Sequence, residues 1–225
     1  MQKINLLNRD SNAAIILAGI LALIIGVGVA RFVFTSLLPA MLEDYLTVSF
    51  AGILASVNYM GYLAGSIFAV FIKDIYTKVK FFRLGMVLSV VTTLVLATTH
   101  NETLWIISRI IAGFGAAMAL VVGSAIVMSK LKFESKTKAM GIHFSGIGFS
   151  ILVSDLIVRG VFSFEGSWEN AWMVLTIFAL ISCAYPIYIL SFDKTIHTKV
   201  IKHHFDFKLF TPFVILLTLA YFCEG

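Results

Sequence analysis

Residues 13–38 read AAIILAGILALIIGVGVARFVFTSLL, an apolar run whose single charged side chain is Arg31. A helix of about 20 apolar residues is long enough to cross the roughly 30 Å hydrocarbon core of a bilayer. Backbone polar groups inside a membrane must be paired internally, so only helices and closed barrels span it. The run lacks the apolar and polar alternation of barrel strands, and it therefore predicts a transmembrane helix.

Similar apolar runs recur along the rest of the chain. Five of them are long enough to span a membrane, and they cover residues 50–72, 81–99, 104–128, 139–162 and 171–192. A further run begins at Leu209 and is still continuing at Gly225. We therefore predict a cytoplasmic N-terminus over residues 1–12, a six-helix bundle over 13–192, a cytoplasmic linker over 193–208 and an incomplete seventh helix over 209–225.

The composition excludes a soluble enzyme. Hydrophobic residues make up 60% of the 225 residues and charged residues only 13%, which is about half the roughly 25% of soluble domains. The mean hydropathy of +0.98 agrees. A soluble fold of this size cannot bury so much apolar surface.

The basic residues predict the orientation. Fourteen of the 17 lie before the first run or in the loops after the second, fourth and sixth: Lys3, Arg9, Lys73, Lys78, Lys80, Arg83, Lys130, Lys132, Lys136, Lys138, Lys194, Lys199, Lys202 and Lys208. Cytoplasmic loops are enriched in Lys and Arg, so we predict that this side and the N-terminus are cytoplasmic. The net charge of +5 is then a topology signal, and no nucleic-acid partner is expected. Trp105, Trp168 and Trp172 near the opposite interface predict an aromatic belt there.

Three ionisable residues fall at membrane depth, where each costs about 2.5–3.5 kcal/mol. Arg31 and Arg109 are expected in the outer third of the bilayer and Asp155 at a similar depth. One interpretation is an anion-binding or proton-linked ion-pair site that faces a central cavity. The alternatives are a structural ion pair, or arginines that extend to the interface. For Arg31 the nearby Gly26 and Gly28 favour function, because glycines allow a backbone or a ligand to approach closely.

Other residues are candidates for binding, proton coupling or packing. The second run contains Asn58 and Tyr59 beside Gly61 and Gly65, whose four-residue spacing favours close helix packing, as does Gly113 in the small-residue fourth run. Asn58 can bond either a neighbouring helix or a solute. His143 can relay protons, although a bond to a neighbouring helix explains it as well. Glu224 in the seventh run is a candidate protonation site.

The order of spans, basic loop and further span resembles the first half of a major facilitator superfamily transporter. The resemblance is carried by Gly-Val-Gly-Val-Ala-Arg-Phe-Val-Phe-Thr-Ser-Leu-Leu-Pro-Ala-Met (residues 26–41), Asn-Tyr-Met-Gly-Tyr-Leu-Ala-Gly (58–65) and Tyr-Phe-Cys-Glu-Gly (221–225). These motifs look like the YbfB/YjiJ branch. The loop at residues 72–80 departs from the superfamily's usual Gly-x-x-x-Asp-Arg-x-Gly-Arg pattern and keeps only an acid, Asp74.

The resemblance implies a six-helix bundle of two inverted three-helix repeats, with Arg31, Asn58 and Arg109 on cavity-lining helices. It also implies that this chain is an N-terminal fragment whose missing partner is the C-terminal bundle of the same protein. We therefore expect a proton-coupled secondary transporter of a small organic solute in the cell (inner) membrane, working by alternating access.

Two rival functions are a membrane-embedded lipid-modifying enzyme and a non-transporting scaffold or sensor. The enzyme lacks support because the sequence contains no Walker loop, nucleophile elbow, HExxH or CxxC motif. We accordingly expect no enzymatic activity, no cofactor and no metal site. The scaffold lacks support because the loops are too short to hold a signalling domain.

Overall fold

The computed structural model describes residues 6–131 and 136–192, and the expected linker and seventh helix lie outside these ranges. The elements are α1 (Asn12–Leu23), η1 (Ile24–Phe32), α2 (Val33–Asp44), α3 (Val48–Phe71), α4 (Ile75–Thr98), α5 (Glu102–Ala117), η2 (Met118–Val122), α6 (Gly123–Lys130), α7 (Lys136–Ser163) and α8 (Trp168–Ile189). Here η denotes a π-helix. All of these elements are helical, as predicted.

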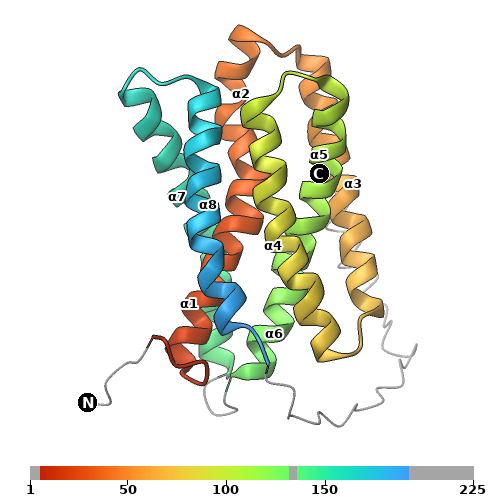
Figure 1. Ribbon diagram of the computed structural model, residues 1–225, viewed down its shortest axis with the longest axis vertical. Coiled ribbons are helices and arrows are strands. Elements are labelled where there is room, and N and C mark those ends of the chain that lie inside the picture. Colours follow the sequence, from red (N-terminus) through yellow and green to blue (C-terminus); the bar gives the residue numbers. More distant parts are fainter. Residues whose placement is uncertain (1–5, 132–135, 193–225) are drawn as a thin grey trace, which may run out of the picture.

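Several elements join end to end into longer rods. α1, η1 and α2 form one continuous helix, Asn12–Asp44, called here the first span, while α5, η2 and α6 form the fourth span, Glu102–Lys130. Together with α3, α4, α7 and α8 they give six helices that are long and apolar enough to cross a membrane, which confirms the predicted all-helical membrane bundle. Figure 1 shows these rods side by side, with their connections at the two ends of the bundle.

The first span is longer than the sequence predicted. We expected it to end at Leu38, but α2 continues through Pro39 to Asp44. Proline removes one helical hydrogen bond and usually kinks or ends a soluble helix. In a membrane bundle the surrounding protein can satisfy the freed carbonyl, and an internal proline is tolerated.

The helix contacts divide the bundle into two matching triplets. The first span packs against α7 and α8, and the fourth span packs in the same way against α3 and α4. The first and fourth spans also touch each other, as do α4 and α8. This is the pattern of two three-helix repeats, the first three spans and the last three, in which the second helix of each repeat packs against the first helix of the other. The first helix of each repeat contains a π-helix. Since each repeat contains three spans, the two run in opposite directions through the membrane.

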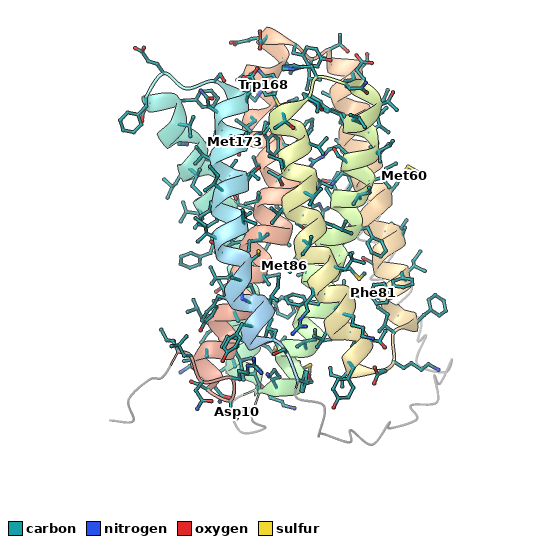
Figure 2. All side chains as sticks on the ribbon, in the orientation of Figure 1. Asp10, Met60, Phe81, Met86, Trp168 and Met173 are labelled. Atoms are coloured by element: carbon teal, nitrogen blue, oxygen red, sulfur yellow. The ribbon has the colours of Figure 1, made fainter. Side chains whose placement is uncertain are left out.

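The first and fourth spans lie at the centre of the bundle. In the most apolar 18-residue stretch of each helix, 72% of the residues are buried in the first span and 67% in the fourth span. The corresponding share is 28% in both α3 and α7. The outward faces of α3 and α7 carry large apolar side chains, and Figure 2 shows Met60 of α3 pointing away from the other helices. α3 and α7 therefore flank a centre made by the first and fourth spans.

Polar residues start several helices. The side chains of Thr47, Asp74, Asn101 and Ser167 each accept a hydrogen bond from a backbone N–H in the first turn of the helix that follows. Such capping residues satisfy amides that have no partner within the helix. The backbone N–H of Thr77, only 2.7 Å from the carboxylate of Asp74, lowers the pKa of that carboxyl.

The predicted aromatic belt is wrong, because its tryptophans are buried in the bundle. Trp105, Trp168 and Trp172 are each at most 3% exposed. The indole N–H of Trp168 donates to Asp44 Oδ2 at 2.8 Å, and that of Trp105 donates to the carbonyl of Thr99 at 2.6 Å. Trp168 lies at the end of the bundle opposite Asp10 (Figure 2), where these bonds link the ends of different spans. A sequence gives a residue's depth more readily than the direction it faces.

Candidate functional site

The two membrane-embedded arginines lie at one level of the bundle. Arg109 of α5 is 1% exposed, and its Nη2 donates a 2.9 Å hydrogen bond to the carbonyl of Ala30, the residue before Arg31. This contact connects the centres of the two repeats. Because the first span reaches Asp44, Arg31 lies near the middle of this helix.

Arg31 is held by aromatic rings. Its guanidinium carbon lies 4.5 Å from the ring centre of Tyr59 and 4.6 Å from that of Tyr62, both on α3. The two tyrosines are three residues apart and so lie on one face of that helix. Among the described residues no hydrogen bond or ion pair reaches Arg31, although its Nε is shielded from solvent. We call Arg31, Tyr59 and Tyr62 the arginine cage.

Asn58 joins the same layer from α3. Its Nδ2 donates a 2.9 Å hydrogen bond to the carbonyl of Arg109, and the side chain is buried. Of the two roles that the sequence allowed, this geometry supplies the bond to a neighbouring helix. Asn58, Arg109 and Ala30 thus form a chain of polar contacts that runs from α3 through α5 to η1.

Glycines permit the close crossing of α3 and α5 at this level. A Cβ atom on Gly61 would lie 2.0 Å from the carbonyl oxygen of Ile110, and one on Gly113 would lie 2.0 Å from that of Asn58. One turn further along α3, a Cβ on Gly65 would lie 2.8 Å from the Cβ of Ala117. These helices touch backbone to backbone, so the polar contacts of Asn58 depend on the glycines.

The first span makes similar contacts through η1. A Cβ on Gly26 would lie 2.2 Å from the Cβ of Ala119 in η2, and one on Gly28 would lie 2.7 Å from the Ser150 carbonyl of α7. Gly26 thus allows the two π-helices to meet, and Gly28 allows α7 to approach. Within α-helices, π-helical turns are frequent at functional sites.

Asp155 is not bonded to either arginine among the described residues, and the shared layer of two guanidiniums and one carboxylate stays a prediction. Its Oδ2 accepts a 2.6 Å hydrogen bond from Nε of Arg159, one turn along the same helix. Arg109 instead uses a backbone carbonyl of the first span. The contacts of Asp155 are thus local to α7, because an i,i+4 partner is always within reach.

His143 lies in a separate contact towards the other end of the bundle. It is 1% exposed, its Nε2 is 2.8 Å from the Ser124 hydroxyl of α6, and a Cβ on Gly19 would lie 2.5 Å from its Nδ1. The histidine therefore joins three helices. Glu224, the other candidate for protonation, lies outside the described residues.

Sequence reasoning did not assign three parts of this arrangement. Tyr62 could have been found from its three-residue spacing to Tyr59. The Ala30 carbonyl could not, because any backbone carbonyl is an equal candidate until the helix crossing is known. The Ser124 partner of His143 likewise has no sequence signal. Among the described residues, no group of three or more His, Cys, Asp or Glu side chains could hold a metal ion.

Comparison with known families agrees with this architecture. A family described as "Uncharacterised MFS-type transporter YbfB" matches residues 23–225, nearly the whole chain. The chain belongs to this YbfB-type family of major facilitator transporters. The match includes the first-span segment with Arg31, the α3 segment with both tyrosines, and the fourth span with Arg109.

Individual relatives of this YbfB-type chain are more distant. It is 28% identical over 152 residues to the "Multidrug efflux pump SdrM" of Staphylococcus aureus (strain N315), covering 67% of this chain and 32% of the relative. It is 26% identical over 104 residues to the "Uncharacterized MFS-type transporter YfiU" of Bacillus subtilis (strain 168), covering 46% and 20%. The chain thus spans about a third or less of these relatives.

Proposed function

We propose that this chain is the N-terminal half of a proton-coupled secondary transporter that moves a small organic solute through a site beside Arg31 and Arg109. The observation that carries the proposal is the pair of guanidiniums at one level of the bundle, with no carboxylate bonded to either among the described residues. Charges inside a membrane are costly, and they typically mark a substrate or ion pathway.

The arrangement of the helices supports alternating access. Many transporters are built from inverted repeats and bind their solute near the middle of the membrane. Rocking of one helix bundle against the other then exposes this site to each side of the membrane in turn. Here both central spans carry a π-helix, and these meet at Gly26 and Ala119, close to Ala30 and the arginine layer. The missing C-terminal bundle is the expected partner that completes the pathway.

Proton coupling requires a group that titrates within the bundle. His143 is a candidate because it is buried among three helices and bonded to one hydroxyl. Asp155, which accepts a hydrogen bond from Arg159, and Glu224 are the other candidates. We propose further that the protein lies in the cell's inner membrane with its N-terminus cytoplasmic, as the basic loops indicate.

The name of the staphylococcal relative, a multidrug efflux pump, is consistent with a small organic solute. Because the family is one of transporters, we propose transport without enzymatic activity.

Sealed vesicles that contain the full-length protein test this function. We expect an imposed proton gradient to drive accumulation of at least one member of a panel of organic anions, cations and neutral molecules. An uncoupler that dissipates the gradient should remove the accumulation, and protein-free vesicles should give the passive leak. Accumulation that survives the uncoupler would disprove proton coupling. A panel in which no compound moves faster than in protein-free vesicles would contradict the transport proposal.

A further inference from the structure

The arginine cage leaves a cation without a counter-ion. No described residue supplies Arg31 with a hydrogen bond or an ion pair, and its Nε is both shielded and unbonded. Arg31 is partly exposed, and a guanidinium whose N–H groups have no described acceptor is free to bind an anion. Neither Tyr59 nor Tyr62 directs its hydroxyl to a described residue, so two further hydrogen-bond donors are free beside the guanidinium.

The surroundings of the cage add to its positive charge. Arg109, which donates to the carbonyl of the adjacent Ala30, is itself a cation with no bonded carboxylate among the described residues. Asp155 is already paired with Arg159 on α7. Among the described carboxylates at the ends of the spans, Asp44 accepts a hydrogen bond from Trp168 and Asp74 accepts one from Thr77.

The geometry of the cage limits the kind of anion. Two tyrosine rings lie within 4.6 Å of the guanidinium carbon and pack around the group, while its N–H groups have no acceptor among the described residues. A guanidinium presents these donors as a planar fork that matches a carboxylate with two parallel bonds. Only one guanidinium is available, since Arg109 is fully buried, so a single negative charge is matched better than the double charge of a phosphate ester.

The cage also faces outwards from the bundle. Tyr59 is 55% exposed and lies on α3, one of the two helices that flank the central spans. A solute approaching this side of α3 would meet the ring and hydroxyl of Tyr59 and then the guanidinium. Arg109 lies behind, covered by protein.

We propose that the arginine cage binds the carboxylate of a monovalent organic anion, which makes the transported solute an organic carboxylate. This inference rests on the proposed transport function for its physiological meaning, but the binding site can be tested separately. Arg31 would form the paired hydrogen bonds, and the hydroxyls of Tyr59 and Tyr62 would donate to the same carboxylate or to the solute's polar groups.

Three planar compounds of nearly equal shape give the sharpest binding test: benzoate, neutral benzamide and the benzamidinium cation. Isothermal titration of the purified full-length protein should show that benzoate binds at least about tenfold more tightly than the other two. Arg31→Gln should weaken benzoate binding about 10- to 100-fold, which is the change in affinity expected when a hydrogen bond to a charged group is lost. Arg31→Lys, which keeps the charge and loses the fork, should give an intermediate loss.

Arg159→Gln is the matched control, because Arg159 is an exposed arginine already paired on its own helix. It should leave benzoate binding unchanged. If Arg31→Gln does not fold, two variants of Tyr59 replace it. Tyr59→Leu, which removes the ring, should weaken benzoate binding more than Tyr59→Phe, which removes only the hydroxyl. Absence of benzoate binding, equal binding of benzamide, or unchanged binding in the folded Arg31→Gln variant would overturn the inference.

The vesicle assay separates this inference from the transport proposal. Arg31-dependent benzoate binding without transport of any compound would leave the anion site standing and refute transport. Transport confined to neutral or cationic compounds would leave the transport proposal standing and refute the carboxylate site.

Discussion

Gly61→Ala is expected to destabilise the full-length protein by about 3 kcal/mol or more, although alanine is the better helix former by about 1 kcal/mol. The new methyl group would lie 2.0 Å from the Ile110 carbonyl oxygen, and a backbone atom cannot turn aside as a flexible side chain can. α3 and α5 must separate, and the hydrogen bond between Asn58 and Arg109 is then lost. Thermal unfolding in detergent measures the effect.

Gly52→Ala is the matched control on the same helix. No atom lies within 4 Å of a Cβ at this position, so the substitution should leave stability unchanged or raise it by up to about 1 kcal/mol. Equal unfolding temperatures for Gly61→Ala and Gly52→Ala would show that α3 and α5 do not cross as closely as described.

Arg109→Ala is expected to reduce transport by the full-length protein to the level of protein-free vesicles while the protein still reaches the membrane. The substitution removes the hydrogen bond that joins α5 to the carbonyl of Ala30. It leaves that carbonyl without its partner, at a cost of about 1–3 kcal/mol, beside the residue that we place in the solute site. Removal of a buried unpaired charge offsets part of this cost, so folding should survive.

Solute uptake, normalised to the amount of protein in the vesicles, measures this effect. Arg159→Ala, which removes an arginine of high exposure from α7, should transport normally. Uptake by Arg109→Ala at the rate of the unsubstituted protein would mean that the link between the two repeats is dispensable.

Sequence features predicted the architecture because the membrane restricts the chain so severely. Runs of about 20 apolar residues are typical of spanning helices, and the described part of the chain contains six of them. The end of the first span was misplaced because Pro39 ends helices in water more often than in a bundle. The two π-helices have no sequence signal beyond the glycines in η1, since their wider turns depend on the neighbouring spans.

The candidate site could be predicted only in part. Arg31, Arg109 and Asn58 stand out because polar groups are rare at membrane depth, and the structure does connect Asn58 with Arg109 and Arg109 with the first span. The direction in which each side chain points follows from helix rotation, which depth alone does not supply. Asp155 and the buried tryptophans illustrate this, because each lies at a plausible depth and faces another way.

Transport by Arg31→Ala tests the central claim most directly. The full-length variant and the Arg159→Ala control should be compared in sealed vesicles under the same proton gradient. If the solute binds beside Arg31, the Arg31→Ala variant should lose at least about 99% of transport while it keeps normal expression and unfolding temperature, and the control should retain full transport. Equal transport by the two variants would show that Arg31 does not belong to the solute site.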